Sequence, residues 1–312
     1  LPSGILRENV VNVMGNGMVI DIRHLCNEMD KLRAAGIVIT PDNLKISDRA
    51  VITMPYHVQQ DCLEEDRLAG KKFGSTRRGI APVYADKYFK KAFRMGELLH
   101  KERLYARVAD IVEWKNLTIA GGYKAQPVKA EDMIAYFEEY GTRLLPYICD
   151  VGVYLNEAHA AGKNIMFEAQ LGALRDIDFG IYPYTSSSST IAAYRRGDGQ
   201  TPQVGPFDVV ASRYGIRCQG AKEIALTKLD VLSDYEELEI CTAYELDGKK
   251  ITEFPFTDAL DKCKPVFEKV KGWHTDISGC RKKEDLPREA LDYIAYIERA
   301  CGCHIRYVSV GA

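Results

Sequence analysis

A lysine and an aspartate end an apolar stretch in the second half of the chain, and this pair could bind a purine base. Lys228 and Asp230 lie within Ala225 to Leu232, which reads A-L-T-K-L-D-V-L. Such a run predicts a buried strand that delivers two charges to the rim of a sheet. A carboxylate can accept both adjacent N–H donors of guanine, and a lysine two residues earlier points to the same side of an extended chain, where its stem can cover the base. A strand end that meets solvent is the alternative for so short a motif.

A second candidate is the loop Gly74 to Pro82, which reads G-S-T-R-R-G-I-A-P. Its backbone N–H groups, the hydroxyls of Ser75 and Thr76, and a nearby cation could hold a phosphate without a helix-borne phosphate loop. The basic residues that follow predict a positively charged helix face: Lys87, Lys90, Lys91 and Arg94. The alternative is a solvated turn followed by a solvated helix.

A third candidate is a run of hydroxyl side chains, Thr185 to Thr190, directly after the aromatic and proline-rich segment Asp176 to Tyr184. Immobilised hydroxyls can donate hydrogen bonds to a phosphate without adding charge. A low-complexity linker is the alternative interpretation.

Hydrophobic periodicity predicts three helices around these segments. They are expected at 21–35, with Asp21 as N-cap, at 130–161, with a kink at Pro146, and at 287–300, with Gly302 as C-cap.

Strands are expected at 164–169, 238–245, 250–256 and 304–310, and Asp247-Gly248 predicts a type I′ hairpin between the second and third. The mixture predicts an α/β fold, with a mainly parallel central sheet covered by helices and a β-hairpin excursion. Without a repeat or an obvious linker, residues 1–312 are expected to form a single domain.

Composition limits the kinds of partner that the chain is expected to bind. A formal charge of -2 over 312 residues argues against nucleic acid, and no apolar stretch is long enough to span a membrane. The start, without methionine or a secretory signal, predicts an N-terminally truncated chain. Nine scattered cysteines, an odd number without C-x-x-C, predict reduced thiols in the cytoplasm; Cys301-Gly302-Cys303 is expected to end a helix rather than bind zinc.

Taken together, these segments resemble the adenylosuccinate synthetase family, GTP-dependent ligases of AMP biosynthesis that join IMP and L-aspartate. The matching motifs extend along nearly the whole chain: L-P-S-G-I-L at 1–6, G-N-G at 15–17, S-D-R-A at 47–50, M-P-Y-H at 54–57, G-S-T-R-R-G-I-A-P at 74–82, D-F-G-I-Y-P-Y at 178–184, A-L-T-K-L-D-V-L at 225–232, F-P-F at 254–256, G-W at 272–273 and Y-V-S-V-G at 307–311.

The resemblance implies roles for particular residues, in a homodimer that uses Mg²⁺. The implied GTP ligands are Lys228, Asp230, Ser309 and Gly311, and the implied IMP ligands are Thr76, Lys90, Gln170 and Ser186. Lys90 occupies the place of an arginine that reaches the IMP phosphate of the other subunit, and lysine loses the bidentate fork. Ser186 replaces a threonine. Gln170 lies one place from the family glutamine, for which Leu171 is the strict match.

Two motifs of the family are missing from residues 1–312: the phosphate loop G-D-E-G-K-G-K, which carries the catalytic base and a magnesium ligand, and the G-H-T segment with the general-acid histidine. Between Tyr194 and Asp208 the arginine-rich loop for aspartate and IMP is also lost. No catalytic residue or metal ligand is therefore assigned, and this polypeptide is expected to be inactive. A non-catalytic guanine-nucleotide-binding or interaction protein that retains the fold is the alternative.

Overall fold

The computed structural model describes residues 1–69, 74–168, 172–188, 190, 206–255 and 257–311. Its Cα atoms cluster into two compact units. The first unit comprises Leu1–Leu171 and Ser186–Asp198, and the second comprises Gly172–Thr185 and Gly199–Ala312. A single domain over residues 1–312 therefore stays a prediction, and the two units are described separately.

Short parallel strands form the sheets of the first unit. One sheet has the order β1 (Asn12–Met14), β3 (Leu44–Ser47) and β5 (Ile148–Cys149), and β2 (Val19–Ile20) pairs with β4 (Val51–Ile52). All of these pairs are parallel, and Ile46, which pairs with Ile148, is fully buried.

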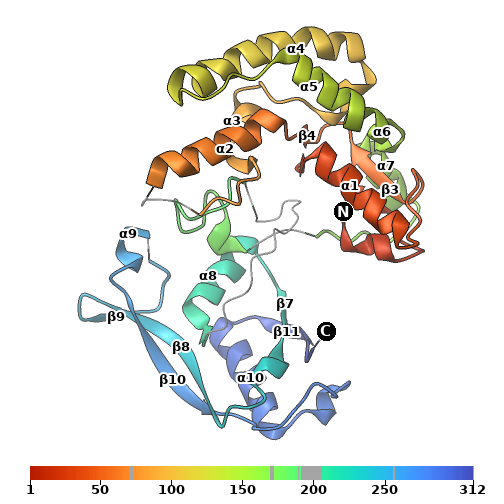
Figure 1. Cartoon of the computed structure of the whole chain (residues 1–312). Coiled ribbons are helices and arrows are strands. Elements are labelled where there is room, and N and C mark those ends of the chain that lie inside the picture. Colours follow the sequence, from red (N-terminus) through yellow and green to blue (C-terminus); the bar gives the residue numbers. More distant parts are fainter. Residues whose placement is uncertain (70–73, 169–171, 189, 191–205, 256, 312) are drawn as a thin grey trace. The chain divides into compact units, whose positions relative to one another are not determined.

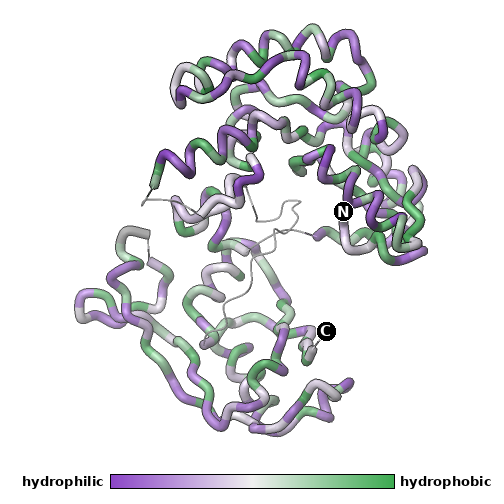
Figure 2. Tube along the Cα trace, viewed as in Figure 1, coloured by the Kyte–Doolittle hydropathy of each residue, from purple (hydrophilic) through white to green (hydrophobic). Residues whose placement is uncertain are grey.

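Helices surround these strands (Figure 1). They are α1 (Ile22–Ala34), α2 (Pro55–Leu68), α3 (Ile80–Tyr88), α4 (Lys101–Asn116), α5 (Ala130–Tyr136), α6 (Thr142–Leu144) and α7 (Val151–Ala160). The predicted helix at 21–35 is confirmed as α1, and the Asp21 side chain accepts a hydrogen bond from the His24 N–H, as an N-cap should. Hydrophilic and hydrophobic segments alternate along α1 (Figure 2), and its Ile22, Leu25 and Met29 are buried.

The prediction of one kinked helix over 130–161 is wrong. After α5 the chain forms a π-helical turn (Phe137–Gly141), then α6, then a 3-10 turn (Leu145–Tyr147), and β5 intervenes before α7. Pro146 has no N–H to continue the helical ladder, so the chain leaves the helix there.

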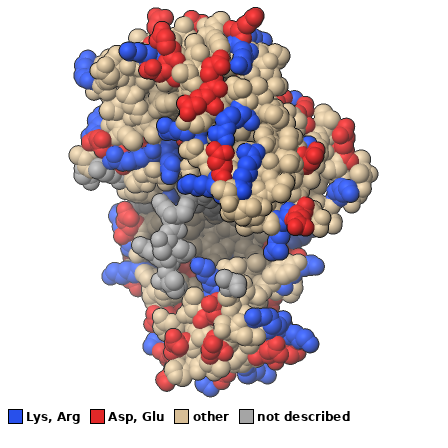
Figure 3. Space-filling view, turned by 45° about the vertical axis from the view of Figure 1, so that its right-hand side comes forward, with Lys and Arg blue, Asp and Glu red and all other residues tan. Residues whose placement is uncertain are grey.

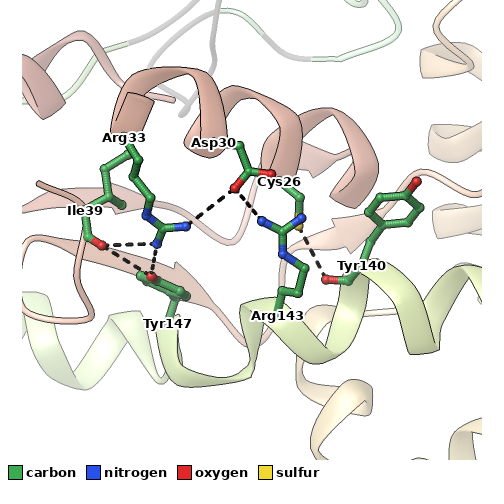
Figure 4. A network of polar contacts seen from close by, with 7 residues as sticks. All are labelled: Cys26, Asp30, Arg33, Ile39, Tyr140, Arg143 and Tyr147. Atoms are coloured by element: carbon green, nitrogen blue, oxygen red, sulfur yellow. Dashed lines mark hydrogen bonds and ion pairs between the residues drawn. The ribbon is translucent and has the colours of Figure 1, made fainter. Parts of the chain in front are cut away.

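Side chains of α1 stabilise this interruption (Figure 4). Arg143 donates to Asp30 at 2.5 Å, and Arg33 donates to the Tyr147 hydroxyl at 2.7 Å and to the Ile39 carbonyl at 3.2 Å. Contacts between residues more than 100 positions apart therefore hold the interrupted segment against α1.

The second unit combines a parallel strand pair with a larger, mainly antiparallel sheet. The pair is β7 (Glu223–Leu226) and β11 (His304–Val308). The larger sheet has the order β10 (Lys264–Lys271), β8 (Glu237–Leu246) and β6 (Phe207–Asp208), with β9 (Lys249–Ile251) antiparallel to β8. Its helices are α8 (Val209–Gln219), α9 (Thr257–Leu260) and α10 (Arg288–Cys301).

Several predictions for the second unit are confirmed. The strand at 238–245 is β8, the helix at 287–300 is α10, and Gly302 ends it in the left-handed conformation. Asp247 and Gly248 have φ values of 51° and 75°, as a type I′ turn requires. The strand expected at 250–256 is shorter, as β9, and described residues 164–168 form no strand.

Short 3-10 and π segments connect these elements: η1 (Ser3–Leu6), η3 (Met95–Leu99), η4 (Leu117–Gly122), η5 (Phe137–Gly141), η6 (Leu145–Tyr147), η7 (Ala173–Arg175), η8 (Leu229–Leu232) and η9 (Lys283–Asp285). The parallel strand pairs, the helices and the hairpin together confirm the predicted α/β class.

Three general properties of the chain are its surface charge, the state of its cysteines and the character of its helices. Basic and acidic side chains both occur on each unit (Figure 3). All nine cysteines are free thiols. Among the described residues, no helix has the length and apolar character needed to cross a membrane.

Candidate functional site

The segment around Lys228 and Asp230 forms a tight turn rather than the predicted strand. β7 ends at Leu226, and its residues are exposed or half-buried, so the prediction of a buried strand over 225–232 is wrong. Lys228 adopts the left-handed conformation, with φ 57° and ψ 42°, and η8 begins at the next residue. The two charged side chains therefore flank the start of a 3-10 turn and do not share one side of an extended chain.

The end of β11 holds this turn in place. The Leu229 N–H donates to the Ser309 carbonyl, and the Ser309 N–H donates to the Leu226 carbonyl, both at 2.9 Å. The Ser309 hydroxyl in turn donates to the Gly311 carbonyl at 2.9 Å. The structure thus brings the pair Lys228 and Asp230 close to the pair Ser309 and Gly311, which lies about 80 positions later in the chain.

Asp230 has an unused hydrogen-bond acceptor. Its Oδ1 atom is buried and has no partner within the described part of the chain, although the residue as a whole is only half-buried. A buried acceptor without a donor costs about 1–3 kcal/mol. The exposed Lys228 beside it offers a cation and an alkyl stem to a ligand.

In the first unit, the 74–79 loop presents Thr76 to solvent. Thr76, Arg77 and Arg78 are exposed, while Gly79 is buried and is the left-handed N-cap of α3. Arg77 also has a positive φ, 55°, and its N–H donates to the Ser75 hydroxyl at 3.1 Å. No hydrogen bond among the described residues uses the Thr76 hydroxyl, so it is available to a ligand.

Two buried carboxylates of α2 lie beneath this loop. Asp61 accepts hydrogen bonds from the Ser75 hydroxyl at 2.7 Å and the Gly79 N–H at 2.8 Å, and Glu65 accepts one from the Ser75 N–H at 3.1 Å. The sequence analysis missed both residues. Their spacing of four, which places them on one helix face directly before a hydroxyl-rich loop, is the signal that could have found them.

Lys90 lies just beyond the other end of α3. The prediction of a basic helix face is wrong, because α3 ends at Tyr88 and Lys90 has a φ of 61°. The Asp86 carbonyl holds this turn by accepting the Lys91 and Ala92 N–H groups at 2.8 and 3.2 Å. Thr76 and the exposed Lys90 therefore lie at opposite ends of α3 and are not brought together.

A buried polar cluster joins α2, α3 and α4. His57 Nδ1 accepts the Met54 N–H at 2.9 Å, so its Nε2 donates to Asp86 at 2.8 Å, and Lys115 donates to the other Asp86 oxygen at 2.9 Å. Burial lowers the pKa of His57 to about 4, although hydrogen bonding to Asp86 opposes the shift. Burial also lowers the pKa of Lys115. The cluster is inaccessible, so it can support the site but cannot touch a ligand.

Of the two remaining predicted residues, Ser186 is described and Gln170 lies outside the described residues. The Ser186 hydroxyl is 3.1 Å from that of Ser188. For metals, the described residues contain no group of three or more His, Cys, Asp or Glu side chains that could hold an ion. The Mg²⁺ expected from the resemblance therefore finds no ligand set in this part of the chain.

The chain is an α/β protein with a half-buried carboxylate in the turn after β7 and an exposed hydroxyl loop before α3. The model of one family, adenylosuccinate synthetase, matches residues 1–203 and 195–312. The chain is 35% identical to adenylosuccinate synthetase of Staphylococcus epidermidis and 37% identical to that of Desulfatibacillum aliphaticivorans, in each case over all of this chain and 84% of the relative.

A solved structure agrees with these sequence matches. The fully ligated adenylosuccinate synthetase from Plasmodium falciparum superposes with a TM-score of 0.87 at 26% identity, covering 99% of this chain and 84% of that one. The chain belongs to the adenylosuccinate synthetase family, whose members are ligases of purine biosynthesis.

The family match also concerns the arginine-rich loop that was expected to be missing between Tyr194 and Asp208. Its two parts meet at residues 195–203, within the segment where the arginine-rich loop was expected to be missing. The alignment with the Staphylococcus epidermidis relative spans 362 positions for the 312 residues of this chain, so this chain has gaps at 50 of them. The residues at the junction lie outside the described part of the structure.

Proposed function

We propose that this chain provides the guanine site and part of the IMP site of an adenylosuccinate synthetase, which joins IMP to L-aspartate at the expense of GTP. One observation carries the proposal: the half-buried Asp230, whose Oδ1 has no partner among the described residues, lies beside the exposed Lys228 in a turn held by Ser309. A carboxylate at this position suits a ligand with N–H donors on one edge, which guanine has and adenine lacks in this arrangement.

In this proposal four residues bind GTP. The Asp230 carboxylate accepts the guanine N1–H and the 2-amino group, and the Lys228 stem covers the face of the base. Backbone groups at Ser309 and Gly311 border the base on the β11 side. The 3-10 turn brings the carboxylate and the lysine to the base from neighbouring positions.

Four other residues bind IMP. Thr76 donates its hydroxyl and N–H to the phosphate, and Ser186 donates a hydroxyl. Gln170 contacts the nucleotide, although this assignment depends on a one-place shift relative to the family. Lys90 binds the phosphate held by the other subunit of a homodimer, because it lies at the end of α3 remote from Thr76.

The reaction transfers the γ-phosphoryl group of GTP to the 6-oxygen of IMP, and the L-aspartate amine then displaces phosphate. Mg²⁺ would neutralise charge during phosphoryl transfer. The residues of this chain bind and orient the two nucleotides. The base, the acid and the metal ligands of the family belong to motifs that residues 1–312 do not contain.

Surface composition supports the homodimer. Tyr88 and Phe89, which directly precede Lys90, are 79% and 68% exposed, and large apolar side chains exposed beside one another favour an interface. The free thiols support a cytoplasmic location, where cysteines stay reduced.

Calorimetric titration of the chain with GTP and ATP tests the guanine site. We expect GTP to bind more tightly than ATP, and Asp230→Asn to weaken GTP binding roughly 10- to 100-fold, the equivalent of one charge-assisted hydrogen-bond pair. ATP affinity should stay unchanged. Asp234→Asn, which alters an exposed aspartate four residues away, is the matched control. Equal GTP affinities for the wild type and Asp230→Asn would contradict the proposal.

A further inference from the structure

The inward face of α2 is unusual for a helix in an α/β unit, because it is mostly polar. The buried residues of α2 are Tyr56, His57, Asp61 and Glu65. The last three are spaced by four and therefore lie on one face. A helix normally turns apolar side chains inward, since a buried charge needs several hydrogen bonds to offset its desolvation. A buried polar face of this kind indicates that its side chains form hydrogen bonds with specific neighbouring groups.

Those partners are the two ends of the 74–79 loop and the end of α3. Asp61, only 6% exposed, holds Ser75 and Gly79, which bracket Thr76, and Glu65, 5% exposed, holds the Ser75 N–H. One turn earlier on α2, His57 holds Asp86, whose carbonyl closes the turn that carries Lys90.

The packing of Gly79 shows how closely this loop is seated on α2. A Cβ atom at Gly79 would lie 2.8 Å from the His57 carbonyl carbon and from the Val58 nitrogen. A further link, between Arg77 and Asp66, joins side chains that are 44% and 62% exposed. An ion pair so exposed contributes little, so the buried bonds of Asp61 and Glu65 are the ones that restrict the loop.

We propose that Asp61 and Glu65 are positioning residues for nucleotide phosphate. They hold the loop in one conformation before ligand arrives, so that the exposed Thr76 hydroxyl and the neighbouring N–H groups already point to the site. Preorganisation of this kind raises affinity because less conformational freedom is lost on binding. The inference depends on the proposed IMP site, to which it adds two residues that do not touch the ligand.

The test measures binding of IMP and GTP to the 312-residue chain by calorimetry. We expect Asp61→Ala to weaken IMP binding roughly 10- to 100-fold and Glu65→Ala roughly 3- to 10-fold, as for lost hydrogen bonds to charged groups. GTP affinity should stay within about twofold, because GTP is proposed to bind in the second unit. Asp110→Ala, which removes an exposed carboxylate of α4, should change neither affinity.

Two comparisons separate positioning from general damage. Asp61→Asn should recover most of the affinity, because its carbonyl can accept from Gly79 and its amide can donate to the Ser75 hydroxyl. The effects of Asp61→Ala and Thr76→Ala on IMP affinity should not multiply. The double variant should bind IMP within about threefold of whichever single variant binds it more weakly, because residues that act through one another are energetically coupled. Independent, multiplying effects would overturn the inference.

The outcomes also distinguish this inference from the function on which it depends. If Thr76→Ala weakens IMP binding and Asp61→Ala does not, the phosphate site stands and the positioning role is wrong. If the wild type does not bind IMP, or Thr76→Ala has no effect, the phosphate site itself is wrong and the inference falls with it. Should Asp61→Ala fail to fold, Ser75→Ala replaces it: roughly 3- to 10-fold weaker IMP binding supports the role, and unchanged binding overturns it.

Discussion

Asp61 and Asp230 differ in the hydrogen bonds that their carboxylate oxygens accept. Both oxygens of Asp61 accept hydrogen bonds from the loop that it supports, whereas Oδ1 of Asp230 is buried without a partner in the described structure. We propose that the first arrangement rigidifies a loop and that the second binds a ligand. The same side chain can therefore support a site or bind in it, and its hydrogen-bond partners indicate which.

At the residue scale, His57 predicts a specific dependence of stability on pH. Its pKa is lowered to about 4 in the folded chain, chiefly by burial, from an ordinary value of 6.5. The unfolded state therefore binds the proton more readily. The stabilisation is complete above pH 6.5 and is lost as pH falls towards 4, by at most roughly 3 kcal/mol.

Urea unfolding at pH values from 8 to 4 measures this effect. We expect His57→Gln to be less stable at pH 8, because the bond to the Met54 N–H is lost, and to depend less steeply on pH below 6.5. His159→Gln, at an exposed position of α7, should retain the wild-type slope. Identical slopes for His57→Gln and the wild type would show that His57 titrates normally.

At the scale of elements, α3 depends on its first and last turns. Gly79 begins it in a left-handed conformation against α2, and Asp86 ends it through its carbonyl. The helix has only nine residues, too few to be stable by itself. Its position is therefore set by the buried bonds to α2 and α4, and the residues at its two ends inherit that position.

Two glycines of the same loop provide a matched pair of variants. Gly79 and Gly74 have similar φ values, 76° and 78°. A Cβ atom would clash with α2 at Gly79, but at Gly74 it would meet no described residue within 4 Å. We expect Gly74→Ala to cost about 1 kcal/mol of stability from backbone strain and Gly79→Ala about 2–4 kcal/mol, because overpacking adds to the strain. Chemical denaturation measures both, and equal losses would mean that the contact with α2 relaxes freely.

At the scale of the whole molecule, the exposed aromatic pair at the end of α3 predicts self-association. We expect the wild type to sediment as a dimer and Phe89→Asp to shift it towards monomer, because a charge in an apolar interface is costly to desolvate. Val38→Asp, at a position 69% exposed in the first unit, is the control and should stay dimeric. A monomeric wild type at micromolar concentration would contradict the homodimer.

Activity provides another test at this scale. We expect a polypeptide made of these 312 residues alone to form no adenylosuccinate from GTP, IMP and L-aspartate, because its sequence contains neither the phosphate loop nor the G-H-T segment. A spectrophotometric assay measures the product. Measurable, GTP-dependent formation by this polypeptide would show that other residues replace the missing groups.

Motifs and local elements were predictable where short-range rules dominate. Asp21, Asp247-Gly248 and Gly302 behave as expected because capping and turn geometry depend on a few neighbouring residues. A kink was predicted at Pro146, but the division of 130–161 into separate elements and the turn at Lys228 were not predicted. Distant partners hold both segments, α1 in one case and Ser309 in the other.

The order of motifs along the chain was sufficient by itself to indicate the α/β class, the family and the identity of the residues implied at its nucleotide sites. Only the tertiary structure decided that Asp61 and Glu65 support the 74–79 loop and that Thr76 and Lys90 lie at opposite ends of α3. It also decided that a buried oxygen of Asp230 has no partner among the described residues. The reason is physical: sequence patterns report local propensity, whereas the burial and hydrogen-bond partners of a charged group depend on which segments pack against it.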